Sequence, residues 1–166
     1  MPMLKLPKDL LADPRSDAIL RLITTDAAPL WEKGTAVVPT LPWTAALTHE
    51  CKEALSGGLL VQGLEAIEKV LAGEQKGLDA VRDKNPSASP GVRVSRLLLL
   101  ANDGSERFYR DCDVILARYG ERILGCRFSI SGEALGEALF GQGKLARAAL
   151  IADRKAVTKV LLALLP

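Results

Sequence analysis

The amino-acid sequence predicts an α/β protein, a three-layer α/β/α sandwich with a mixed, mostly parallel sheet of about four strands. Short apolar runs of strand length alternate with segments of helical periodicity from residue 59 onward. The run Arg93–Ala101 ends in consecutive apolar residues, which is typical of a strand that is covered on both faces. This alternation favours a sheet whose connecting helices pack on its two sides.

Apolar runs define the expected strands, and apolar residues spaced three or four apart define the expected helices. Serine or aspartate precedes several of these helices as an N-cap, and Gly120 follows the end of one. The expected strands are 59–61, 93–101, 123–129 and 146–152, and the expected helices are 43–55, 63 to between 73 and 81, 105–119, 132–140 and 154–165.

Prolines divide the chain. The first 40 residues contain five of them, and only Arg15–Thr25 shows helical spacing there. We therefore expect residues 1–41 to form an N-terminal extension with one helix. Residues 42–166 are expected to form a single α/β domain. The stretch DKNPSASPGV at 83–92 predicts a loop insertion in that domain.

The composition argues against a membrane protein and against a disulfide-bonded or zinc-bound one. The purely apolar runs, among them Leu97–Ala101, are far shorter than the roughly 20 residues that span a bilayer. The first residues carry prolines and acids where a signal peptide needs an apolar core, so we expect a cytoplasmic protein. The three cysteines have no CxxC spacing, and we expect no metal or cofactor.

The two halves of the chain differ in charge. Residues 1–92 hold ten Lys/Arg and twelve Asp/Glu, while residues 93–166 hold twelve and eight. The C-terminal half is therefore mildly basic, which indicates where a nucleic-acid partner would bind.

Catalytic chemistry has few candidates. His49 is the only histidine, so a Ser–His–Asp triad has only that residue as its base. Asp103 follows a predicted strand, at the sheet edge where α/β proteins often bind ligands. A turn and helix cap explains the same residue. Glu133 and Glu137 lie four apart on one predicted helix, and a solvated face explains them.

A series of short motifs follows in order from residue 43. The segment KEALSGGLLVQG (52–63) ends one helix, and Gly63 opens another of the form G-x-x-x-(I/V)-x-K with Ile67 and Lys69. A strand then ends in the acidic turn of LLLLANDGSE. The segment GEALGEALFGQGKLARAALIA, close to E-x-L-G-x-A-x-G followed by a strand, precedes a last amphipathic helix. Together these motifs resemble the ribosomal-protein superfamily L-seven-Ae/L-thirty-e, whose members bind kink-turns and related RNA bends.

The resemblance implies an RNA surface where the loop before the last strand approaches the start of the second helix. It also implies that GEALGEAL is a helix on the sheet with Leu135, Ala138 and Leu139 inward, its repeat being coincidental. The family's Asn–Glu pair, which reads kink-turn base pairs, is replaced here by Glu65 and Ala66. The implied RNA-binding residues are Gly63, Lys69, Gly141, Gly143, Lys144, Arg147 and Arg154.

Three functions remain open from the sequence. The first is a non-catalytic RNA-binding or ribosome-associated module, with phosphate contacts from the basic residues and from backbone amides of the glycine loop. The second is a protein-interaction or structural subunit that keeps the fold without RNA recognition. The third is an enzyme that uses the turn around Asp103.

Overall fold

The computed structural model describes residues 4–84 and 92–166. Its main sheet has five strands in the order β3-β6-β5-β7-β4, and β1 and β2 form a separate two-stranded sheet. The strands are β1 (Ala28–Pro29), β2 (Val37–Val38), β3 (Thr40–Leu41), β4 (Leu60–Gln62), β5 (Arg96–Leu100), β6 (Ile123–Phe128) and β7 (Ala148–Ile151). The helices are α1 (Lys8–Leu11), α2 (Ser16–Thr24), α3 (Ala45–Ser56), α4 (Leu64–Lys84), α5 (Glu106–Tyr119), α6 (Gly132–Phe140) and α7 (Arg154–Leu162), with a 3₁₀ turn, η1, at Gly120–Arg122.

The four predicted strands all belong to the main sheet, with shorter bounds than the apolar runs suggested. β5 lies at the centre, parallel to β6 and antiparallel to β7. β3 and β6 are parallel, whereas β4 and β7 are antiparallel. The sheet is therefore mixed, as predicted. Parallel pairings do not outnumber antiparallel ones, because β7 runs against both of its neighbours.

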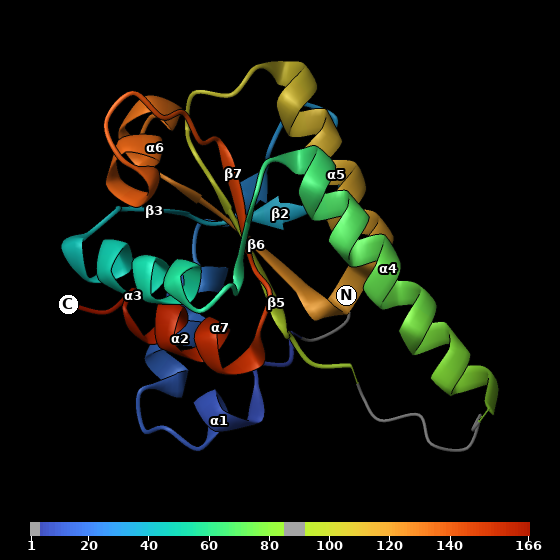
Figure 1. The fold of residues 1–166 in the computed structure, drawn as a ribbon. Helices are drawn as coiled ribbons and strands as arrows, with labels where there is room; N and C mark the ends of the chain where they lie inside the picture. The colour runs from blue at the N-terminus through green and yellow to red at the C-terminus, as the bar shows by residue number, and fades with distance from the viewer. Residues whose placement is uncertain (1–3, 85–91) are drawn as a thin grey trace.

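Helices lie on both faces of the main sheet (Figure 1). The inward residues of β5 alternate between two core clusters, as the two-residue period of a strand requires. Leu97 and Leu99 belong to the cluster that includes buried residues of α1, α2, α3, α6 and α7. Leu98 and Leu100 belong to the cluster that includes buried residues of α4 and α5. β5 is thus buried on both faces, as its continuous apolar sequence predicted.

Residues 4–41 pack into this core. Leu6, Leu10, Ile19 and Ile23 are buried in the same cluster as Leu97 and Leu99. The segment contains two helices where one was predicted, and it supplies β3 as an edge strand of the main sheet. The apolar residues of KDLL and of the helix at 16–24 explain this packing, since their burial offsets the irregular, proline-rich connections between them.

α4 is longer than the other helices and projects past the edge of the sheet (Figure 1). An ion network anchors it where it leaves the sheet. The Glu74 carboxylate accepts hydrogen bonds from Arg96 and from Arg122, whose side chain is buried. The loop insertion was predicted to begin at residue 83, but Asp83 and Lys84 belong to α4. Residues 85–91 of that prediction lie outside the described residues.

Within residues 4–84 and 92–166, no helix is both long enough and apolar enough to cross a membrane.

The central position of β5 predicts that both of its faces are sensitive to truncation. Leu98 and Leu99 are fully buried, in the two different clusters. Leu98→Ala and Leu99→Ala are each expected to lower the free energy of unfolding by ~2–5 kcal/mol in urea denaturation, because each leaves a cavity. A loss below about 0.5 kcal/mol in either variant would contradict burial of that face.

The Glu74 network predicts a pH-dependent contribution to stability. Burial alone would raise the pKa of Glu74, but hydrogen bonds and charges from Arg96 and Arg122 outweigh it and hold this pKa below the usual 4.5. The stabilisation is therefore present above pH 4.5 and is lost as the pH falls through the lowered pKa. Glu74→Gln should be less stable than the wild type at pH 7, with the gap narrowing in acid. A gap that does not change with pH would contradict the network.

Candidate functional site

Four connections meet at one edge of the main sheet, which we call the carboxyl edge. They are the turn after β4 (62–63), the turn after β5 (101–105), the residues after β6 (129–131) and the loop before β7 (141–147). They meet because β4, β5 and β6 end at this edge, whereas the antiparallel β7 begins there.

Close packing between α6 and the loop that follows it determines this geometry. A Cβ atom placed on Gly136 would lie 2.2 Å from the carbonyl oxygen of Lys144. A Cβ atom on Gly132 would lie 2.6 Å from Cγ of Arg147. Only glycine fits at either position without a shift. The glycine that opens each GEAL unit is therefore required by packing.

The inward face predicted for α6 is confirmed in part. Leu135 and Leu139 are buried, while Ala138 is half-buried. Ser131 caps the helix by accepting a hydrogen bond from the Ala134 amide, as its position predicted.

The loop after α6 exposes its backbone. Gly141 has a φ of +107° and Gly143 a φ of +81°, a region that L side chains rarely adopt. Residues 141–145 are all exposed, including Lys144. The loop thus presents glycine backbone and one lysine to solvent.

The turn at Gly63 lies directly beside this loop. The Gly63 amide donates to the carbonyl of Ala148, 3.0 Å away, and the Gln62 side-chain amide donates to the carbonyl of Leu145, 2.8 Å away. Gly63 has a φ of +88°, which lets the chain turn from β4 into α4. The predicted juxtaposition of the second helix's start with the loop before the last strand is therefore present.

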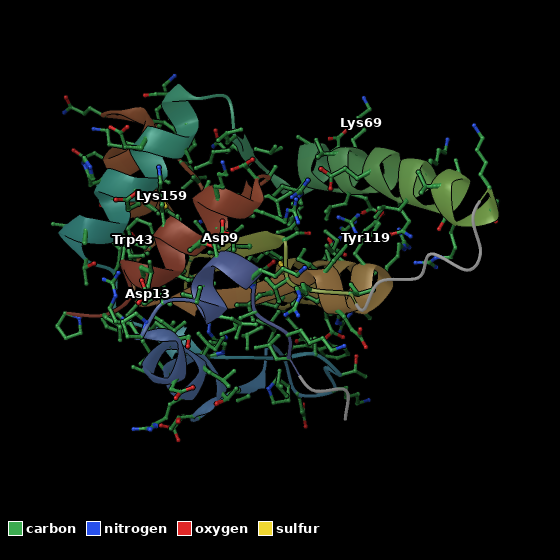
Figure 2. The ribbon with its side chains drawn as sticks, turned by 90° about the horizontal axis from the view of Figure 1, so that it is seen from below. Asp9, Asp13, Trp43, Lys69, Tyr119 and Lys159 are labelled. Atoms are coloured by element: carbon green, nitrogen blue, oxygen red, sulfur yellow. The ribbon has the colours of Figure 1, made fainter. Side chains whose placement is uncertain are left out.

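Lys69 extends the same area along α4. Figure 2 shows its side chain on the outer face of α4, directed away from the rest of the molecule. It is exposed, and it lines a shallow hollow at the helix start. That hollow is formed by Gln62, Gly63, Leu64, Glu65, Ala66 and Lys69.

Arg147 and Asp103 form a structural pair at this edge. The carboxylate of Asp103 accepts a hydrogen bond of 2.9 Å from the Gly132 amide. The same oxygen lies 3.4 Å from Nε of Arg147. Asp103 thus caps the start of α6 and partly neutralises Arg147. The acidic turn after β5 therefore helps to hold α6 in place. Its position after a strand did not predict this role.

Arg154 lies at the opposite edge of the sheet. β7 runs from Ala148 at the carboxyl edge to Ile151, and the Ala152 amide bonds to the carbonyl of Leu59, before β4 begins. Arg154 follows as the first residue of α7. Of the predicted RNA-binding residues, the structure brings Gly63, Gly141, Gly143, Lys144 and Arg147 to one edge with α4 and Lys69, but not Arg154.

Much of the basic surplus in the C-terminal half is engaged within the protein. Arg96 and Arg122 bind Glu74, and Arg118 pairs with Glu68. Hydrogen bonds, ion pairs or an aromatic ring of the protein also engage four further arginines of this half, which are Arg93, Arg110, Arg127 and Arg147. Lys69 and Lys144 join no ion pair within the part of the chain that the structure describes.

The three thiols are not placed for surface chemistry. Burial raises the pKa of each of Cys51, Cys112 and Cys126 to about 12, so all three remain protonated at neutral pH. Among residues 4–84 and 92–166, no group of three or more His, Cys, Asp or Glu is arranged to hold a metal ion.

Sequence reasoning missed Gln62 as part of the site. Its side chain ties the loop to the start of α4 across the sheet edge. The only signal available was its place immediately before the helix-opening glycine.

Comparison with known proteins leaves the family open. No family model and no curated protein matches the chain. A solved structure of a protein with unknown function from Bacillus halodurans C is similar with a TM-score of 0.47 and 16% sequence identity. The match covers 74% of this chain and 98% of that chain.

Two glycine substitutions test the packing that shapes the site. Gly136→Ala should destabilise the protein by more than about 1 kcal/mol, because its Cβ would meet the Lys144 backbone. Gly73→Ala, within α4, meets nothing within 4 Å and should be neutral or stabilising by up to about 1 kcal/mol. Urea denaturation measures both. Equal effects of the two changes would show that α6 and the loop are not closely packed.

Proposed function

We propose that this protein is a cytoplasmic, non-catalytic RNA-binding or ribosome-associated module, built as a three-layer α/β/α sandwich of the L-seven-Ae/L-thirty-e type. One observation carries the proposal. The turn that leads into α4 is joined at the carboxyl edge to the end of the loop 141–147, since the Gln62 side chain bonds to the Leu145 carbonyl and the Gly63 amide to the Ala148 carbonyl.

Backbone amides supply the chemistry for binding phosphate. The first amides of a helix have no partner within the helix, and the helix dipole favours an anion there. α4 begins at Leu64, at the same end of the sheet as the exposed Gly141–Gly143. An RNA backbone lying across both segments would meet donors from each, with Lys69 and Lys144 as flanking cations.

The local charge limits the strength of this binding. Lys69 and Lys144 join no ion pair among the described residues, but Arg147 is partly neutralised by Asp103, and Glu65 stands at the helix start. A carboxylate near phosphates is unfavourable unless it accepts a donor from a base edge. We therefore propose weak, strongly salt-dependent RNA binding with little selectivity for kink-turns.

A second function is favoured by the projecting part of α4. Leu78 and Val81 lie on the same side of the helix as the buried Ile67 and Leu71, but they are 46% and 65% exposed. α4 has passed the edge of the sheet at that point (Figure 1). A protein-interaction or structural subunit would use such an uncovered helix face.

RNA binding is tested with two pairs of substitutions that each remove two exposed cations. Lys69→Ala with Lys144→Ala should weaken binding of an RNA hairpin at low salt and reduce the slope of log affinity against log salt by roughly 1–2. Arg154→Ala with Lys155→Ala, at the opposite edge, should have little effect. Titration of a kink-turn RNA at the same salt should show a preference below about tenfold.

Equal losses from the two pairs would show diffuse electrostatic attraction instead of a defined surface. Absence of binding to either RNA at low salt would contradict the RNA proposal and leave the interaction subunit.

A further inference from the structure

The start of α6 holds the side chain of Arg147 at its base. A Cβ atom on Gly132 would lie 2.6 Å from Cγ of Arg147 and 3.3 Å from its Nε, so the side chain packs directly on that glycine. The Arg147 carbonyl also accepts a hydrogen bond of 2.9 Å from the Ala101 amide. Because its backbone and the base of its side chain are both held, the guanidinium of Arg147 stays at the carboxyl edge.

The guanidinium of Arg147 has few partners within the protein. Its Nε is buried and makes no hydrogen bond within the part of the chain that the structure describes. The nearest carboxylate oxygen, from Asp103, is 3.4 Å from Nε, longer than the roughly 2.7–3.2 Å of a good N–H···O bond. The side chain of Arg147 is 39% exposed. An arginine in this state still has donors for a phosphate, which it can bind through two parallel hydrogen bonds.

The Asp103 carboxylate stands where such a phosphate would approach. One of its oxygens accepts a hydrogen bond of 2.9 Å from the Gly132 amide, and the same oxygen faces Arg147. The side chain of Asp103 is 41% exposed, so its negative charge is also open to the surface. A phosphate that reaches Arg147 therefore meets a like charge beside it, which opposes binding.

We propose that Asp103 competes with RNA phosphate for Arg147, so that RNA binding at the carboxyl edge requires this arginine to exchange a carboxylate for a phosphate. The inference rests on the proposed RNA-binding function and names a residue that limits its affinity. Asp103 keeps its hydrogen bond to the Gly132 amide during the exchange, so α6 stays capped. Only the contact between Asp103 and Arg147 changes.

The weakness of the ion pair makes the exchange feasible. Ion pairs between partly exposed side chains contribute little to stability, because water screens both charges. A phosphate offers Arg147 two charge-assisted hydrogen bonds in place of one long contact. The carboxylate nevertheless remains near the bound phosphate and repels it. Asp103 is therefore expected to lower the affinity for RNA while it holds the start of α6.

Removal of the Asp103 charge tests the competition. In Asp103→Asn the side-chain oxygen can still accept the Gly132 hydrogen bond, but the negative charge is gone. We expect this variant to bind an RNA hairpin about three- to tenfold more tightly than the wild type at low salt. The slope of log affinity against log salt should steepen by roughly 0.7–0.9, the value for one added phosphate contact.

The matched control is Glu121→Gln. It changes the net charge by the same amount, but Glu121 is an exposed residue of η1, before β6 begins and thus at the opposite edge of the sheet. The affinity of this variant for the hairpin should differ from that of the wild type by less than about twofold.

A double-mutant cycle with Arg147→Ala shows whether Asp103 acts through this arginine. Arg147→Ala should weaken binding less than about threefold in the wild-type protein and about tenfold in Asp103→Asn. A variant that fails to fold cannot imitate the predicted gain. Asp103→Ser removes the same charge and replaces Asp103→Asn in the cycle if urea denaturation shows that the asparagine variant is unfolded.

Equal affinity of the wild type and Asp103→Asn, with both binding the hairpin, would overturn the competition and leave the RNA-binding proposal standing. An equal gain in Glu121→Gln would overturn it as well, since net charge alone would then explain the effect. A gain that persists in full without Arg147 would overturn the exchange of partners. Absence of binding by both the wild type and Asp103→Asn at low salt would contradict the RNA-binding proposal itself, and this inference with it.

Discussion

The contact between α6 and the loop that follows it determines where β7 enters the sheet. Gly136 allows the Lys144 carbonyl to lie where any other residue would place its Cβ atom. The chain therefore turns back at the end where β6 stops, and β7 runs antiparallel between β5 and β4. This reversal places Leu145 beside Gln62 and Ala148 beside Gly63. Without it, the glycine loop and the start of α4 would not share an edge.

Charged residues from the two halves of the sequence pair with one another in the folded protein. The mildly basic C-terminal half folds against acids of α4, with Glu74 held by Arg96 and Arg122. The charge surplus therefore contributes to holding α4 in place, and only part of it remains for a partner. Under the RNA-binding proposal, the two exposed lysines would provide few phosphate contacts, and each contact would contribute modestly to affinity at physiological salt. Shape and backbone donors must then supply much of any recognition.

The sequence predicted the mixed α/β class and four strands of the main sheet because the signals for them are local. The apolar run of β5 and the cap at Ser131 both depend on neighbouring residues. The order and direction of strands depend on distant packing, so the reversal of β7 was not predicted. β3 is only two residues long and follows Pro39, so the sequence carried no strand signal there. At the candidate site, the resemblance supplied the glycines and lysines as candidates, whereas the structural roles of Gln62 and Asp103 appear only when the loops are placed together.

The central claim is that one edge, formed by the start of α4 and the loop 141–144, is the RNA-binding surface. The most direct measurement is an NMR titration of the ¹⁵N-labelled protein with an RNA hairpin at low salt, following each backbone amide. The account predicts the largest shifts at Leu64–Ala66 and at Gly141–Lys144, with little change at Arg154. Shifts centred on the start of α7, or spread evenly over exposed basic residues, would contradict it.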